Sequence, residues 1–281
     1  MGNLKKELNQ SLTPFFIIEN KESIYMNKVL KTRKIALCLA VASLINIPVF
    51  AESVQDFETQ ILKQYDQSRL TDRYESDGIN QQAALKIADF IESHPQSFDY
   101  NFKNLTSKNM ISIYYSPDRK LKFYTFDVSA GGTMREFESY VQFKQGKKVL
   151  TQAVKDGGFI RSVQQTQLNQ QTVYLISSTY VGSSCVGAYA LQAAHIKNAK
   201  YKAIDVFKTR TQTMNNINVD YDCNYYPQNI EPFDMNRHYI RMSKDLNHID
   251  ILVIKPSGEL TQNYLRYQKT KDHYQYIGTV K

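Results

Sequence analysis

The chain has 281 residues, a formal net charge of +8, no tryptophan and only three cysteines. A chain of this length can bury a full hydrophobic core without the help of a disulfide. The lysines are spread over predicted turns, which excludes a dedicated nucleic-acid binder, because such a protein clusters its cations on one element with aromatic residues between them.

Residues 1–25 are polar, lack a clear period and precede a second methionine, Met26, which opens a complete export signal. We interpret residues 1–25 as an upstream extension that comes from a start placed too early. Residues 26–51 have the three parts of a secretory signal peptide: a basic start, a short apolar run from Ile35 to Ile45, and the helix-breaking Pro48.

The end of this segment predicts where it is cleaved. Val49 and Ala51 supply small residues at positions −3 and −1, so signal peptidase would cut after Ala51 and leave Glu52 as the new N-terminus. A membrane anchor is the alternative, but the apolar stretch falls short of the ~20 residues that a spanning helix needs. We therefore expect a periplasmic or secreted protein without a stable membrane span.

Cleavage also changes the charge and the cysteine count. Seven Lys/Arg and three Asp/Glu leave with residues 1–51, so the processed chain carries +4. Cys38 leaves too, and Cys185 and Cys223 remain. An even pair in an oxidising compartment predicts one disulfide, which would add about 3 to 4 kcal/mol to stability on a chain-entropy argument. We expect this bridge to fix a local loop rather than to hold the domain together.

Two apolar stripes with helical spacing follow the signal peptide. The first consists of Val54, Phe57, Ile61, Leu62 and Tyr65, and the second of Ile79, Ala83, Ile87 and Ile91. We expect Asp77 to cap the second helix and His94 to end it, because the residue before a proline avoids the α region. Residues 52–108 are thus predicted to form a helical N-terminal segment packed on a β domain of residues 109–281.

From about Met110 the apolar period changes to two, which predicts strands. The clearest strands are residues 121–128, 138–143, 173–180, 249–254 and 274–277, separated by turns that contain Gly, Pro, Asn or Ser. Three stretches, residues 123–152, 174–204 and 249–278, have a similar order of apolar strand, Gly-bearing loop, second strand and Lys-rich turn. The fold class is therefore mainly β, as an antiparallel sandwich, a barrel or a propeller-like meander, with two N-terminal helices.

One segment resembles a known group of proteins. Residues 118–127, DRKLKFYTFD, followed by Gly131-Gly132-Thr133-Met134, are similar to a D-x-K-L-x-x-Y-x-x-D…G-G-T-M run of uncharacterised exported bacterial β-rich proteins. The resemblance covers about 20 residues and implies an exported β-rich protein. It implies no reaction.

The segment around Cys185 is the candidate for a catalytic site. Ser183 or Ser184 would be the nucleophile of an exported hydrolase of peptidoglycan or protein, or Cys185 would be, with His195 as the base. The G-x-S-x-G spacing is absent, and Cys223 is available as a disulfide partner, so we prefer the disulfide. Glu136 and Glu138 would share one strand face, where they would form an acid/base pair or saccharide clamp. We prefer the interpretation that they pair with basic residues across the ladder.

We expect no cofactor, and a polar cluster near Cys223 offers calcium binding as the alternative. Its ligands would be Asp220, Asp222, Asn224 and Glu231, whose positions 1, 3, 5 and 12 match those of a calcium loop. The sharp turn of such a loop needs glycine at position 6, where this chain has Tyr225. We prefer the interpretation as a polar loop tethered by the disulfide.

Nineteen tyrosines remain after processing, and three of them, Tyr221, Tyr225 and Tyr226, lie close to Cys223. Tyrosine is favoured at recognition surfaces because it joins a flat apolar ring to a polar tip. Since no complete catalytic constellation is present, we expect an exported envelope protein that binds another protein or a wall component. An inhibitor or an immunity-type protein would fit this expectation.

Overall fold

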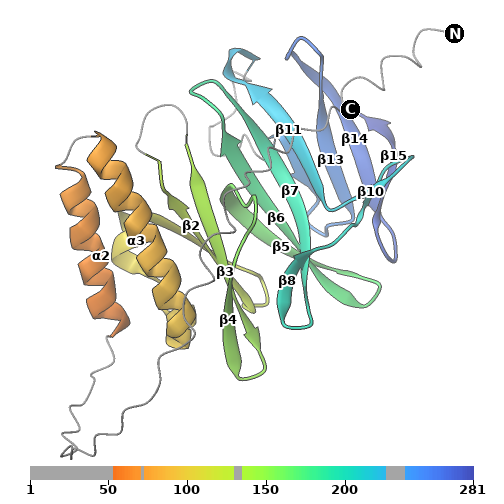
Figure 1. The fold of residues 1–281 in the computed structure, drawn as a ribbon. Helices are drawn as coiled ribbons and strands as arrows, with labels where there is room; N and C mark the ends of the chain where they lie inside the picture. The colour runs from red at the N-terminus through yellow and green to blue at the C-terminus, as the bar shows by residue number, and fades with distance from the viewer. Residues whose placement is uncertain (1–52, 71–72, 130–134, 226–237) are drawn as a thin grey trace, which may run out of the picture. The chain divides into compact units, whose positions relative to one another are not determined.

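The computed structural model describes residues 53–70, 73–129, 135–225 and 238–281, except for the side chains of Arg73, Tyr74 and Asp77 (Figure 1). The described residues form a mainly β fold with antiparallel sheets and a few helices, as the sequence predicts. None of the helices in this part of the chain is long and apolar enough to cross a membrane. The predicted signal peptide, residues 26–51, lies outside the described residues.

In the described residues, four helical elements precede the first strand: α2 (Val54–Ser68), α3 (Arg73–Ser93), the 3-10 helix η1 (Pro95–Asp99) and α4 (Lys103–Ser107). Ser53 caps α2, since its hydroxyl accepts from the Asp56 amide at 3.1 Å. The second helix ends before Pro95 as predicted, but it begins at Arg73, so the prediction of Asp77 as its cap was wrong. The apolar stripe begins only where the helix meets the core, and therefore does not mark the first turn.

The first sheet consists of four antiparallel strands in chain order: β1 (Ile111–Tyr115), β2 (Leu121–Asp127), β3 (Phe137–Gln145) and β4 (Lys148–Ala153). The second sheet contains β5 (Phe159–Leu168), β6 (Gln171–Val181), β7 (Val186–Lys197), β8 (Lys200–Ala203) and β11 (Asn216–Asp222). Both β8 and β11 pair with β7, at different parts of its length. The short 3-10 helix η2 (Cys223–Tyr225) follows β11.

The third sheet contains β9 (Phe207–Lys208), β10 (Thr213–Met214), β12 (Ile240–Met242), β13 (His248–Ile254), β14 (Leu260–Lys269) and β15 (Tyr274–Val280). Its pairs are antiparallel apart from a two-residue parallel pairing of β15 with β9. Each sheet is thus built around a four-stranded meander, β1–β4, β5–β8 or β12–β15. These meanders contain the three similar stretches seen in the sequence.

The buried side chains separate into three clusters that show how the layers are stacked. One cluster joins the helices to the first sheet, the next lies between the first and second sheets, and the largest lies between the second and third. Strand β6 shows why one sheet can contribute to two clusters. Its Val173 and Leu175 belong to the largest cluster. Its Tyr174 and Ile176 belong to the middle one. Successive side chains point to opposite faces of a strand, so a strand between two cores is buried on both faces.

Because the meanders are antiparallel, their connections alternate between two ends of the stack. We call one end the turn face; it comprises residues 117–120, 144–148, 168–171, 197–202, 243–247 and 269–273. We call the other end the loop face; it comprises residues 127–129, 135–138, 153–159, 181–187, 220–225 and 254–260. The two-residue connections 169–170 and 198–199 on the turn face have positive φ at both positions, as type I′ hairpins require.

Candidate functional site

The loop face brings together most of the residues that the sequence analysis singled out. Its segments come from all three sheets and contact one another: the Arg135 amide donates to the Val181 carbonyl at 3.5 Å. A Cβ atom on Gly158 would meet the ring of Tyr180, and one on Gly258 would meet the ring of Tyr225. The loop face is therefore a continuous surface built on rigid sheets, the usual arrangement for a recognition site.

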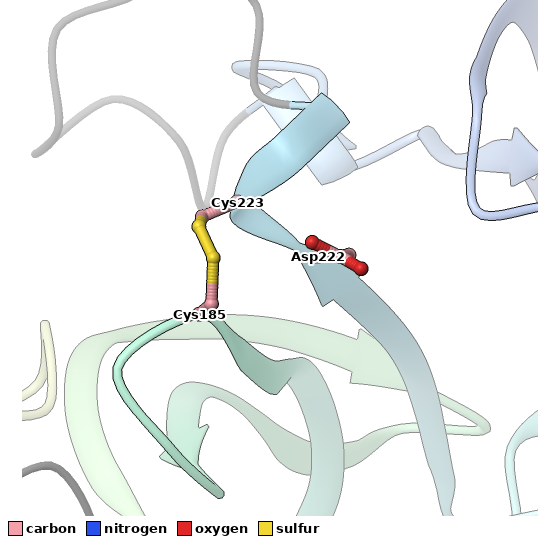
Figure 2. A group of neighbouring side chains, drawn as sticks. All are labelled: Cys185, Asp222 and Cys223. Carbon is pink, nitrogen blue, oxygen red and sulfur yellow. A yellow bond between two sulfur atoms is a disulfide. The ribbon is translucent and has the colours of Figure 1, made fainter.

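Cys185 and Cys223 form the predicted disulfide, with their Cα atoms 4.8 Å apart (Figure 2). The bridge extends a ladder that already exists, since Val186 pairs with Asp222 and the Cys223 amide donates to the Cys185 carbonyl at 2.7 Å. It closes a loop with a sequence separation of 38. Its local effect is to hold the connection after β6 against the end of β11.

The predicted recognition tyrosines differ in exposure. Tyr221 is half-buried, and its ring lies 4.9 Å from that of Tyr189 and 6.3 Å from that of the fully buried Tyr239. Tyr225 is 38% exposed and lies against Gly258. Tyr226 lies outside the described residues. Of the two described tyrosines, Tyr225 is therefore exposed to solvent, whereas Tyr221 lies at the edge of the core.

A cavity of about 580 Å³ opens beside the disulfide loop. Its lining includes Glu136, Glu138 and Asp156, together with Leu85 of α3 and Gly182 of the connection after β6. The two glutamates that the sequence analysis singled out thus line one cavity. Asp156 was not singled out, because the sequence gives no sign that the connection after β4 reaches the same place.

The charges around this cavity are mainly negative. Its one cationic lining residue among those described, Arg135, is paired with Asp127, since its Nη1 lies 2.6 Å from a carboxylate oxygen. The phenol of Tyr140 donates to Glu138 at 3.3 Å, and burial followed by the charge of Glu138 raises the pKa of that phenol. Such a cavity suits a ligand that carries an amine, a guanidine or several hydroxyl groups.

The residues of the hydrolase alternative are not brought together. Ser183 accepts bonds from the amides of Cys185 and Val186, each at 3.2 Å, while Ser184 is exposed. His195 lies near the other end of β7, nine residues beyond Val186, which is about 30 Å along an extended strand.

The environment of His195 is also unlike that of a catalytic base. The ring is buried, and the side-chain amide of Gln171 donates to its Nδ1. Burial, and then the charges of Lys197 and Lys202, lower the pKa of His195. With Cys185 in a disulfide, no nucleophile of the loop face contacts a histidine among the described residues.

The described residues do not support the hypothesis of a calcium site. The Asp222 carboxylate accepts from the backbone amide of Asn224 at 2.9 Å and from its side-chain amide at 2.8 Å, which makes a local turn. Asp220 is exposed on β11, and Glu231 lies outside the described residues. Asp222 lies near both cysteines, but a sulfur atom in a disulfide is not a thiolate ligand.

Comparisons of the chain with protein-family models, with curated proteins and with solved structures found no match.

Proposed function

We propose that this protein is an exported, non-enzymatic envelope protein that binds another protein or a wall component through its loop face. The observation that carries the proposal is that the longer connections of three sheets, the disulfide, the exposed Tyr225 and the acidic cavity all lie at one end. The opposite end has mostly tight turns. Loops that vary on a rigid scaffold are where binding surfaces are usually found.

The chemistry of the loop face suggests how the partner is held. Val186 is 44% exposed and Tyr225 is 38% exposed, so both supply apolar contact area next to the disulfide. The carboxylates of the neighbouring cavity would receive an amine or guanidine group of the partner. The disulfide would preorganise the loop, which lowers the entropy cost of binding.

Site-specific crosslinking tests the proposal. A photo-reactive amino acid placed at Val186 in the expressed full chain should capture one discrete envelope species in cells. The same amino acid at Lys202, an exposed position on the turn face, is the matched control and should not capture that species. A second probe at Tyr225 covers the other large hydrophobic side chain that is exposed on the described loop face. Equal capture at Val186 and Lys202, or no capture at either Val186 or Tyr225, would count against the loop face as the binding surface.

A second variant tests the acidic cavity. The double substitution Glu136→Gln/Glu138→Gln removes two charges and keeps the side-chain shapes, and should weaken capture from Val186 by about tenfold, since hydrogen bonds to charged groups contribute roughly 1.5 to 3 kcal/mol. Glu92→Gln/Asp66→Asn removes two exposed carboxylates from the helices, outside the loop face, and controls for net charge. Equal effects of the two double variants would exclude a specific role for the cavity.

A further inference from the structure

The two ends of the stacked sheets carry opposite charge. The turn-face segments contain eleven Lys or Arg residues and three carboxylates, whereas the described loop-face segments contain three Lys or Arg residues and seven carboxylates. The basic set comprises Arg119, Lys120, Lys144, Lys147, Lys148, Lys197, Lys200, Lys202, Lys244, Lys269 and Lys271. All are exposed except Lys269, which is half-buried. Turns far apart in the sequence thus place eleven Lys or Arg residues at one end.

Contacts between the turns show that they lie side by side. The Lys144 amide donates to the Lys120 carbonyl at 3.0 Å, which joins the two turns of the first sheet. The Asn169 amide donates to the Lys271 carbonyl at 2.6 Å, which joins a turn of the second sheet to one of the third. In Figure 1 these turns lie at one end of the sheets, and the connections after β6 and β13 lie at the opposite end.

Further contacts connect the three sheets at this end. The phenol of Tyr174 donates to Asp118 at 3.0 Å, and the amide of Asp118 donates to Gln165 at 3.1 Å. A shallow pocket is lined jointly by Asp118, Gln165, Asp245 and Lys269, which belong to different sheets. The basic residues are therefore displayed on one continuous surface and not on isolated tips.

The turn face keeps a net charge of +8, because its three carboxylates offset only three of its eleven Lys or Arg residues. Asp245 accepts from Ser243 and Asn247 of its own turn, and hydrogen bonds from these residues lower its pKa to about 2. Asp272 bonds to Thr270 and His273 of its own turn. Among the described residues, Lys144 pairs with Asp99, whereas the other cations of the turn face form no ion pair.

We propose that the turn face binds the phosphate groups of an anionic phospholipid membrane, which leaves the loop face pointing away from the bilayer. Ten of the eleven cations are lysines, which act as mobile point charges suited to headgroups, whereas bidentate recognition of one phosphate favours arginine. Clusters of 4–8 basic residues bind anionic membranes, because each Lys or Arg near the surface contributes attraction.

Two features favour a membrane over a nucleic acid. None of the large exposed apolar or aromatic side chains of the described residues, Leu70, Leu85, Val186, Tyr225 and Ile277, lies on the turn face. Single-stranded nucleic acids need aromatic rings on which bases stack, and duplexes are read by an element that enters a groove. The tight turns of this face provide neither feature.

Vesicle co-sedimentation tests the inference with the processed protein purified from cells that express the full chain. The native protein should sediment with vesicles of phosphatidylcholine and phosphatidylglycerol but not with vesicles of phosphatidylcholine alone, and added salt should weaken the binding. The turn-face variant Lys147→Glu/Lys200→Glu should lower the partition coefficient for anionic vesicles by at least about tenfold.

The control variant is Lys63→Glu/Lys155→Glu, which changes the net charge equally at two exposed positions away from the turn face and should bind as the native protein does. Equal losses in both variants, or no loss in the turn-face variant, would overturn the inference. Binding to phosphatidylcholine alone, or binding to a DNA duplex without binding to vesicles, would also overturn it. Circular dichroism of both variants checks that they are folded.

Discussion

The side-chain amine of Lys122, on the central strand β2, donates a hydrogen bond of 2.8 Å to the backbone carbonyl of Ser97 in η1. Lys122 is fully buried and donates a second bond to the carbonyl of Tyr100. Its Nζ lies 4.6 Å from the ring centre of Tyr124 and 5.2 Å from that of Phe102. This lysine therefore ties the segment after α3 to the first sheet.

The pH dependence of stability follows from this burial. Desolvation lowers the pKa of Lys122 to about 7, which is below its unfolded value of 10.5. Between these two values the unfolded chain binds a proton that the folded protein has lost, so the free energy of unfolding should rise as pH increases through 7. Below pH 7 both states are protonated, so the full free-energy cost of burying the charged amine lowers the stability of the fold.

The substitution Lys122→Met isolates this effect. The variant should lose the rise in stability between about pH 7 and pH 9, a range below that in which ordinary tyrosines ionise. It should also be less stable than the native protein at pH 9, because two carbonyl groups lose their donor. Urea unfolding at several pH values measures both effects, and an identical pH profile in the two proteins would contradict the lowered pKa.

Glu58 of α2 is the second buried charge that joins helices. Its carboxylate accepts from the amides of Asn104 and Leu105 at 2.8 and 3.1 Å, and from the phenol of Tyr100 at 2.5 Å. Glu58→Gln should lower the free energy of unfolding by about 1 to 3 kcal/mol, because the amide group cannot accept all these bonds. Glu92→Gln, at an exposed position of α3, is the control and should change it by less than about 0.5 kcal/mol.

Replacement of two glycines by alanine should change the stability of the protein in opposite directions. A Cβ atom on Gly187 would collide with the carbonyl of Tyr180 and the phenol of Tyr221, so Gly187→Ala should destabilise the β6–β7 hairpin beside the disulfide. A Cβ atom on Gly78 in α3 would meet nothing within 4 Å, so Gly78→Ala should stabilise the protein by roughly 0.5 to 1 kcal/mol. Thermal midpoints of both variants decide the matter, and shifts of the same sign would refute this account.

Intact mass checks export and the disulfide together. Protein from the envelope fraction should begin at Glu52 and should take up no alkylating reagent before reduction, because Cys185 and Cys223 are joined. After reduction it should take up two equivalents. A free thiol before reduction would return Cys185 to consideration as a nucleophile, and retention of residues 26–51 would indicate an anchored protein.

Removal of the bridge should weaken the fold without abolishing it. The double variant Cys185→Ser/Cys223→Ser should lose about 3 to 4 kcal/mol on the chain-entropy estimate. The far-ultraviolet circular dichroism should persist, since the ladder between β7 and β11 holds the same segments through backbone bonds. Complete unfolding at room temperature would show that the bridge holds the whole domain together.

The sequence by itself determined the local structure. Alternating apolar residues and Gly- or Asn-bearing turns predict the strands and the three repeated meanders, because periodicity and turn geometry depend on neighbouring residues. The pairing of Cys185 with Cys223 followed from the cysteine count and the expected oxidising compartment. The burial of Lys122 could not be predicted, since a lysine between apolar residues on a strand normally faces water, and its acceptors lie on a separate element.

Only the tertiary structure decided which distant segments share a surface. The order in which the sheets stack places Asp156 on the same cavity as Glu136 and Glu138, and separates His195 from the disulfide loop by most of the length of β7. The same stacking gathers lysines from separate turns at one end. These relations depend on side-chain packing between sheets, which residues far apart in the chain create together and which no local pattern records.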